Sequence, residues 1–230
     1  MVSNLNSHTS KSKIPTSVGI KVCGMKYNTE LVAALEPDYL GFIFYDKSPR
    51  DFEGLHIPPL PNGIKKVGVF VDAPLAFVLD KTNKYQLDVI QLHGNESPEY
   101  IKELKSYHSV EENRVLSSAV EIWKVFSIMD QFDFERLKPY EDLVDNFLFD
   151  TKGKAKGGNG YTFDWSVLKD YPSKTPFILS GGIGLDEIDS LKEILATNLP
   201  IAAIDVNSRF EIEPGMKDLK KLITLKKLMM

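Results

Sequence analysis

The sequence predicts an α/β protein of one domain, a (β/α)8 TIM barrel. Short apolar runs recur about 20 to 35 residues apart, the length of a repeated strand-plus-helix unit. Most runs are apolar throughout, as expected for parallel strands that are covered on both faces. The 230 residues contain no linker that would divide them. We therefore assign residues 19–230 to the barrel and residues 1–18 to a flexible polar leader.

Eight apolar runs are expected to form the strands of the barrel. They are Ile20–Cys23, Tyr39–Phe44, Lys66–Val71, Val89–Leu92, Trp123–Ser127, Phe147–Asp150, Phe177–Ser180 and Ala203–Val206. A doubly wound open sheet is the structural alternative. It would usually need fewer strands and a glycine fingerprint after the first one, which Cys23-Gly24-Met25-Lys26 does not provide.

Helices are expected between most of these strands. Ser97-Pro98-Glu99 combines an N-cap residue, a proline at the first helical position and an acidic first turn. Apolar residues also recur at helical spacing in two later segments, Leu185, Ile188, Leu191 and Leu195 in one and Leu219, Leu222, Ile223 and Leu228 in the other. The last segment predicts a packing helix that closes the domain. The second and fifth units are the weakest, and prolines interrupt the second.

Charge and composition exclude several classes of protein. The net charge of −4 argues against a general nucleic-acid binder, which would show a basic face. No stretch approaches the roughly 20 apolar residues that span a bilayer, and the polar start of the chain lacks the apolar core of a signal peptide. The one cysteine fits a reducing compartment. We expect a cytoplasmic protein with no membrane or nucleic-acid partner.

The strand ends contain a possible acid–base pair, Cys23 and Asp150. Reactive side chains of a barrel lie at the C-terminal ends of its strands. An aspartate that ends an apolar strand is partly desolvated, which raises its pKa and suits a general acid. A thiol can act as a general base where its surroundings favour the thiolate. Alone, Cys23 would be interpreted as a packing residue and Asp150 as a helix cap, but the two together favour catalysis.

The last two strands end in turns that predict a phosphate site. Gly181 and Gly182 follow the seventh strand and lead into a helix, and glycines allow a close backbone approach. Asp205, Asn207 and Ser208 lie at the end of the eighth strand. Barrels commonly bind phosphate in these two loops, although two ordinary strand-to-helix turns would look the same.

Other polar residues lie near the same mouth. Arg50 follows Pro49 in a short loop, where its guanidinium could grip a carboxylate with two hydrogen bonds or simply be solvated. His93 ends the fourth strand and is expected to support the site rather than catalyse. Residues 152–160, rich in lysine and glycine, predict a mobile lid or a solvated loop beside Asp150.

From about Ile20 to the C-terminus the motifs resemble those of the phosphoribosylanthranilate isomerases, barrel enzymes of tryptophan biosynthesis. An ordered set of motifs carries the resemblance: Lys21-Val22-Cys23-Gly24-Met25, Leu40-Gly41-Phe42-Ile43-Phe44 with Ser48-Pro49-Arg50, Val67-Gly68-Val69-Phe70, Gln91-Leu92-His93-Gly94, Asp150, Gly157-Gly158-Asn159-Gly160 with Phe163-Asp164-Trp165, Leu179-Ser180-Gly181-Gly182-Ile183, and Pro214-Gly215-Met216-Lys217-Asp218.

The resemblance implies an Amadori rearrangement of a phosphorylated aminosugar, N-(5′-phosphoribosyl)anthranilate, to 1-(2-carboxyphenylamino)-1-deoxyribulose 5-phosphate. Asp150 would protonate the ring oxygen, and Cys23 would remove the proton from C2′. Arg50 would hold the anthranilate carboxylate, the loops around Gly182 and Ser208 the phosphate, and Asp205 the sugar or the phosphate loop. No metal or organic cofactor is implied, and a monomer and a homodimer both remain open.

The chain departs from the family pattern in two turns. Asn207-Ser208-Arg209 replaces the usual Ser-Ser-Gly, and Gly157-Gly158-Asn159-Gly160 replaces Gly-Gly-Thr-Gly. Arginine does not adopt the backbone of a glycine at positive φ cheaply, so the phosphate loop is expected to differ in shape. Arg209 itself is a candidate phosphate contact.

Two alternatives to the isomerase stay open from the sequence. One is another phosphate-binding barrel enzyme, namely an indole-glycerol-phosphate synthase or a sugar-phosphate epimerase. The synthase would need catalytic lysines at strand ends and the epimerase metal-binding histidines, whereas His93 is the only strand-end histidine. The other is a non-catalytic barrel that binds a phosphorylated ligand or serves as a scaffold.

Overall fold

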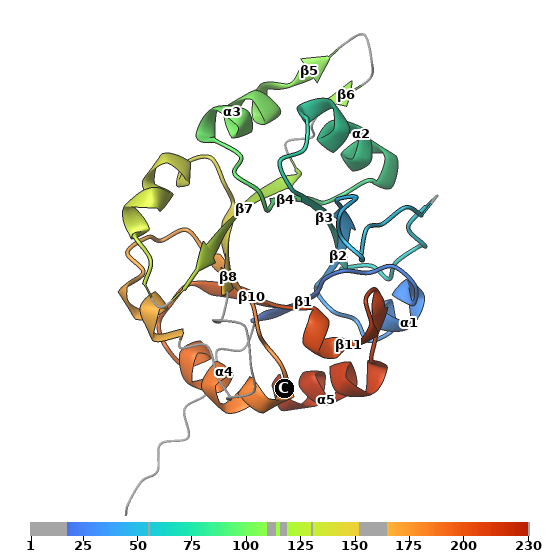
Figure 1. Ribbon diagram of the computed structural model, residues 1–230, viewed down its shortest axis with the longest axis vertical. Helices are drawn as coiled ribbons and strands as arrows, with labels where there is room; N and C mark the ends of the chain where they lie inside the picture. Colours follow the sequence, from blue (N-terminus) through green and yellow to red (C-terminus); the bar gives the residue numbers. More distant parts are fainter. Residues whose placement is uncertain are drawn as a thin grey trace, which may run out of the picture.

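The chain forms a closed barrel of eight parallel strands (Figure 1). The computed structural model describes residues 18–54, 56–109, 114–115, 119–129, 131–151 and 165–229. Around the barrel the strands follow the order β1-β10-β9-β8-β7-β4-β3-β2, so neighbours in space are mostly neighbours in sequence. The predicted TIM barrel is confirmed. The predicted leader and the Lys/Gly-rich loop at 152–160 lie outside the described residues.

All eight predicted strands are present, with ends that differ from the prediction by at most two residues. The barrel strands are β1 (Gly19–Val22), β2 (Tyr39–Phe44), β3 (Lys65–Phe70), β4 (Val89–Leu92), β7 (Glu121–Ile128), β8 (Asn146–Thr151), β9 (Phe177–Ser180) and β10 (Ile201–Val206). Two short antiparallel pairs lie outside the barrel: β5 (His108–Ser109) with β6 (Arg114–Val115), and β11 (Glu211–Glu213) with β12 (Met216–Lys217).

Helices surround the barrel (Figure 1). They are α1 (Thr29–Ala33), α2 (Leu75–Tyr85), α3 (Pro98–Ser106), α4 (Ile188–Leu195) and α5 (Leu219–Met229), with 3₁₀ helices at Phe134–Tyr140, Trp165–Asp170, Leu185–Glu187 and Ser208–Phe210. The units predicted to be weakest depart from the α-helix, since the described residues between β2 and β3 contain no helix and a 3₁₀ helix with an internal proline follows β7.

Helix α3 begins as the sequence predicts. The Ser97 hydroxyl accepts a hydrogen bond from the backbone nitrogen of Tyr100 at 3.2 Å, and Pro98 occupies the first turn. The side chain thereby satisfies one of the backbone donors that a helix leaves unpaired at its start. On its inner face α3 buries Ile101 and Leu104.

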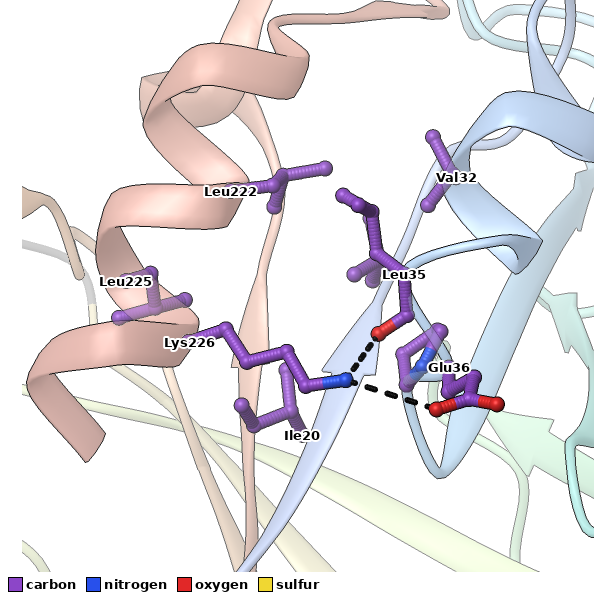
Figure 2. Close-up of a pocket in the computed structure, with 9 residues that line it drawn as sticks. Ile20, Val32, Leu35, Glu36, Leu222, Leu225 and Lys226 are labelled. Carbon is purple, nitrogen blue, oxygen red and sulfur yellow. Dashed lines mark hydrogen bonds and ion pairs between the residues drawn. The ribbon is translucent and has the colours of Figure 1, made fainter. Parts of the chain in front are cut away.

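The closing helix α5 forms, but its apolar stripe differs from the predicted one. Leu222 and Leu225 are buried, whereas Ile223 and Leu228 are 39% and 38% exposed. Ile223 and Leu228 are each rotated about 100° or more around the helix from Leu222, so they flank the packed face. Leu222 and Leu225 line a small cavity together with Val32 of α1 and Leu35 (Figure 2). Its volume is about 30 Å³.

A polar contact fastens α5 beside that cavity. The Lys226 ammonium donates a hydrogen bond to the Leu35 carbonyl at 2.7 Å and lies 3.8 Å from the Glu36 carboxylate (Figure 2). The contact joins the C-terminal helix to the end of the first strand–helix unit. It therefore helps to close the ring of helices where the last unit meets the first.

Two apolar cores hold the barrel together. One fills the barrel interior and contains Val67, Val89, Trp123, Leu148 and Ile178 together with the Cys23 thiol. The other lies between the strands and the helices and is rich in aromatic side chains that meet mainly edge to face. Such side chains supply much of the free energy that stabilises a fold of this kind.

Candidate active site

A cavity of about 260 Å³ opens at the C-terminal ends of the strands. It is lined by Cys23, Ile43, Val69, Gln91, His93, Asp150, Ser180, Gly181, Gly182, Ile183, Asp205, Asn207, Ser208 and Arg209. Every residue predicted for the site lines this cavity except Arg50. The fold thus brings together side chains that come from β1, β4, β8, β9 and β10 and the loops that follow them.

Strand register explains why these groups meet. Lys21 of β1 pairs in register with Asp205 of β10, Asp205 with Ser180 of β9, and Ser180 with Asp150 of β8. Four adjacent strands therefore present one row of polar residues near the mouth of the barrel. Cys23 follows β1, and its backbone nitrogen donates to the Val206 carbonyl at 2.9 Å, which continues the β1–β10 ladder.

The Cys23 thiol occupies space that a neighbouring glycine leaves open. Cys23 is 5% exposed, and a Cβ built on Gly41 of β2 would lie 2.8 Å from its sulfur. Only glycine at position 41 leaves the thiol in place without a shift of the backbone or the sulfur. The motif Leu40-Gly41-Phe42 does not by itself predict this role of Gly41.

Charged groups close to Cys23 act on it in opposite directions. Burial raises the pKa of the Cys23 thiol, Lys21 lowers it, Asp205 raises it and Lys217 lowers it, with burial the largest effect and a raised pKa as the result. Among the neighbouring charges, Lys21 has the largest effect on the thiol, because its ammonium attracts the thiolate. The protonated thiol therefore predominates at neutral pH, and its thiolate is a strong base when it forms.

Asp150 lies within reach of His93, and His93 in turn contacts Gln91. The His93 Nε2 atom is 3.5 Å from the Asp150 Oδ2 atom, and the Asp150 side chain is 22% exposed. The Gln91 amide nitrogen is 3.1 Å from His93 Nδ1. If the amide donates to Nδ1, the imidazole carries its proton on Nε2, toward Asp150. The supporting role of His93 stays a prediction, and the structure places Gln91 beside it.

The turn after β9 has the backbone geometry of a glycine turn. Gly181 and Gly182 have φ values of +87° and +68°, a region that disfavours other residues. Among the described residues other than its own chain neighbours, no atom lies within 4 Å of a Cβ built on Gly182. Asn207 and Ser208 line the cavity beside it. The Asn207 side-chain oxygen accepts a hydrogen bond from Lys217 at 2.8 Å.

Arg50 grips a carboxylate with two hydrogen bonds, but that carboxylate belongs to the protein. Its Nε and Nη2 atoms lie 3.0 Å and 2.6 Å from the Glu211 side chain. Glu211 also accepts hydrogen bonds from Lys217 Nζ at 2.7 Å and from the Gly215 backbone nitrogen at 3.1 Å. Burial raises the pKa of Glu211, but the bonds from Arg50 and Lys217 outweigh it, so the pKa is lowered.

Five residues that act on the predicted site residues were not predicted from the sequence. They are Lys21, Gly41, Gln91, Glu211 and Lys217. A lysine within an apolar strand, two residues before Cys23, is the one local signal that could have revealed Lys21. The described part of the chain holds no group of three or more His, Cys, Asp or Glu residues placed to bind a metal. Across the same residues, no helix has the length and apolar character to cross a membrane.

The fold and the cavity define a class: a TIM-barrel enzyme with a thiol, a carboxyl group and a glycine turn at one mouth, suited to proton transfer on a phosphorylated small molecule. Comparison with known proteins identifies the family. The family model for N-(5'phosphoribosyl)anthranilate (PRA) isomerase matches residues 20–227. The chain belongs to this family. Its activity is that of a PRA isomerase, an aldose–ketose isomerase of tryptophan biosynthesis.

Individual relatives agree with this assignment. The N-(5'-phosphoribosyl)anthranilate isomerase of Parabacteroides distasonis is 42% identical over 210 residues, which cover 88% of this chain and 89% of the relative. The crystal structure of the enzyme from Thermotoga maritima matches with a TM-score of 0.72 at 29% identity over 92% of this chain and 98% of the other. A PRA isomerase in complex with reduced 1-(o-carboxyphenylamino)-1-deoxyribulose 5-phosphate matches with a TM-score of 0.70 at 27% identity, with the same coverage.

Proposed function

We propose that Cys23 and Asp150 carry out the isomerisation as general base and general acid. The observation that supports this assignment is that the two side chains line one cavity at the C-terminal mouth of the barrel, beside the glycine turn of β9. Cys23 is a free thiol that directly follows β1, and the Asp150 carboxylate lies 3.5 Å from His93 Nε2.

The reaction needs only proton transfers. Asp150 protonates the furanose ring oxygen of N-(5′-phosphoribosyl)anthranilate, and the ring opens to a protonated Schiff base. The Cys23 thiolate then removes the proton from C2′, and the electron pair of that C–H bond neutralises the iminium nitrogen. The resulting enolamine tautomerises to the ketone as C1′ gains a proton and the C2′ hydroxyl loses one. Cys23 forms no covalent bond to the substrate, and no metal or organic cofactor takes part.

The remaining groups would bind the phosphate, the sugar and the anthranilate carboxylate of the substrate. The turns with Gly181 and Gly182 and with Asn207 and Ser208 would bind the phosphate. The Asp205 Oδ1 atom is buried without a hydrogen-bond partner among the described residues, and it would accept a bond from a sugar hydroxyl.

Arg50 would attract the anthranilate carboxylate while Glu211 holds its Nε and Nη2 atoms. A guanidinium has five N–H donors, so the donors that Glu211 does not use remain for a second carboxylate. Glu211 would thereby fix the direction in which Arg50 presents its charge.

We further propose that residues 19–230 act as one barrel domain in the cytoplasm, either alone or as a homodimer. A dimeric phosphoribosylanthranilate isomerase is known from Thermotoga maritima, and it resembles this chain with a TM-score of 0.68 at 28% identity.

Complementation of a tryptophan auxotroph that lacks this step tests the proposal. The unaltered chain should restore growth, and Cys23→Ala and Asp150→Ala should not, although both variants accumulate as folded protein. Growth with both variants would rule out the acid–base pair. A soluble chain that failed to complement would favour a binding or scaffold role for the barrel. Turnover of the purified proteins provides the quantitative form of the test.

A further inference from the structure

Lys21 is the residue that lies beneath the proposed base. It is fully buried in β1, two residues before Cys23, so both side chains point to the interior of the barrel. Its ammonium donates a hydrogen bond to Asp205 Oδ2 at 2.9 Å, and its charge interacts favourably with the Cys23 thiolate. A buried ammonium is costly unless it is paired, so a lysine at this place needs a reason.

The carboxylate that pairs with Lys21 keeps one oxygen without a hydrogen bond to the described residues, unlike a carboxylate in a purely structural ion pair. Asp205 Oδ2 also receives a long hydrogen bond from Ser180, 3.4 Å in length, whereas Asp205 Oδ1 has no partner among the described residues. Burial alone would lower the pKa of Lys21, but Asp205 and Cys23 together raise it. The ammonium is therefore charged at neutral pH and is held between a carboxylate and a sulfur.

We propose that Lys21 is a positioning residue for Cys23, which fixes the sulfur at the mouth of the barrel and stabilises its anionic form by charge. Asp205 opposes this effect, because its negative charge disfavours a second anion nearby. The two residues together set how much thiolate is present. This inference rests on the proposed role of Cys23 as base.

The other charges near Cys23 are compensated by their own partners. Lys217 of β12 faces Cys23 but donates to Glu211 at 2.7 Å and to Asn207 at 2.8 Å. Arg50, in the loop after β2, also acts on Cys23 but is paired with Glu211. Lys21 lowers the pKa of the thiol more than Lys217 does. Lys21 is thus the cation whose removal should change Cys23 most.

The single cysteine of the chain makes a direct test possible. The ultraviolet absorbance of the thiolate, recorded against pH with Cys23→Ala as the blank, reports the pKa of Cys23 without any substrate. We expect Lys21→Met to raise this pKa by about one unit and Asp205→Asn to lower it. A general distortion of the site would not move the two variants in opposite directions.

Kinetics give a second readout. A thiol pKa that is one unit higher leaves about tenfold less thiolate at neutral pH, so kcat/KM of Lys21→Met should fall roughly three- to tenfold. The loss should shrink as the pH rises and Cys23 ionises. A structural defect would lower kcat/KM equally at every pH.

The double variant Lys21→Met/Asp205→Asn keeps the test decisive if Lys21→Met alone does not fold, because it leaves no unpaired buried charge. Its thiol pKa should lie above that of the wild type, since Lys21 has the larger effect. A value at or below that of the wild type would overturn the role of Lys21. A thiol pKa that shifts as expected while kcat/KM does not follow would instead overturn the role of Cys23 as base, so the two failures are distinguishable.

Discussion

Two buried lysine–carboxylate pairs lie on opposite sides of the barrel wall. Lys21 and Asp205 meet inside the barrel at 2.9 Å, and Lys124 and Glu96 meet outside it at 3.0 Å. The outer pair is completed by its surroundings: Glu96 also accepts hydrogen bonds from the backbone nitrogens of Asp72 and Gly94, and Lys124 donates to the Gly94 carbonyl at 2.7 Å. The inner pair leaves Asp205 Oδ1 without a partner in the described part of the chain.

The difference separates a structural network from a functional one. Glu96 and Lys124 use their hydrogen bonds to fix the loops after β3 and β4, and the second loop carries His93. Burial lowers the pKa of Lys124, whereas Asp205 and Cys23 outweigh burial and raise the pKa of Lys21. A completed network stabilises the fold, and an incomplete one keeps polar atoms available for a substrate.

The largest expected effect is the loss of catalysis on substitution of Asp150, which lies in register with Ser180 and Asp205 at the mouth of the barrel. Asp150→Asn keeps the size of the side chain but removes the proton donor, so we expect kcat to fall by between about 10²- and 10⁴-fold. The free energy of unfolding, measured with urea, should change by no more than about 1 kcal/mol. A variant with near-normal kcat would show that another group supplies the proton.

Substitution in the outer pair, Lys124 and Glu96, should lower the stability of the fold and leave the pH dependence of catalysis unchanged. Lys124→Met leaves the Glu96 carboxylate buried without its counter-ion, which should cost about 3–5 kcal/mol of the free energy of unfolding. The pH dependence of kcat/KM of the folded fraction should stay as in the wild type. Lys138→Met is a suitable control, because Lys138 and Glu135 form a surface pair with side chains 67% and 71% exposed. That change should leave the free energy of unfolding almost unchanged, because exposed ion pairs contribute little.

Substitution of two glycines tests the same difference between the outer loops and the mouth of the barrel. A Cβ on Gly94 would lie 2.5 Å from the Asp72 backbone nitrogen, so Gly94→Ala should overpack the outer loops and cost about 1–3 kcal/mol in unfolding. A Cβ on Gly182 would meet no described residue beyond its chain neighbours within 4 Å, but the φ is +68°, so Gly182→Ala should cost only about 1–2 kcal/mol in backbone strain. Gly182→Ala should raise KM for the phosphorylated substrate, and equal KM effects at both positions would contradict a phosphate site after β9.

Acid pH tests the cluster around Glu211. Its pKa is lowered, since the hydrogen bonds from Arg50 and Lys217 outweigh burial. The stability that these bonds contribute is therefore present above the unfolded pKa of about 4.3 and is lost as the pH falls through the lower folded value. Glu211→Gln should be less stable than the wild type at neutral pH by about 1–3 kcal/mol, and the two unfolding curves should converge in acid. Parallel curves would contradict the lowered pKa.

The smallest effect is expected at Arg209, which replaces the usual glycine of the family. Its side chain lines the cavity, is 58% exposed and lies 4.0 Å from the Glu187 carboxylate. An exposed cation near a phosphate contributes little, so Arg209→Gly should raise KM about two- to fivefold without a change in kcat. An unchanged KM would remove the side chain from the phosphate site.

Much of the barrel was predictable because its signals are local. An apolar run of four to six residues that ends in a polar residue predicts both a strand and a position at the mouth, and Cys23 and Asp150, which end such runs, both line the cavity. The face of α5 was predicted less well, because Ile223 and Leu228 are apolar yet flank the packed side.

The partners within the site were not predictable from local patterns. Lys21 and Asp205 are separated by 184 positions in the chain, and Arg50 and Glu211 by 161. Only strand register and the return of the chain past β10 bring each pair together. The expectation that Arg50 grips a substrate carboxylate could not anticipate that Glu211 grips Arg50 first.

The most direct test of Cys23 as the base compares two titrations of the free enzyme. One is the ionisation of the single thiol, and the other is the pH profile of kcat/KM, whose breaks report the pKa values of the essential groups of the free enzyme. We expect both to give the same raised pKa in the wild type and to shift together in Lys21→Met. A kcat/KM that stays level across the pH range in which Cys23 ionises would contradict a thiolate base.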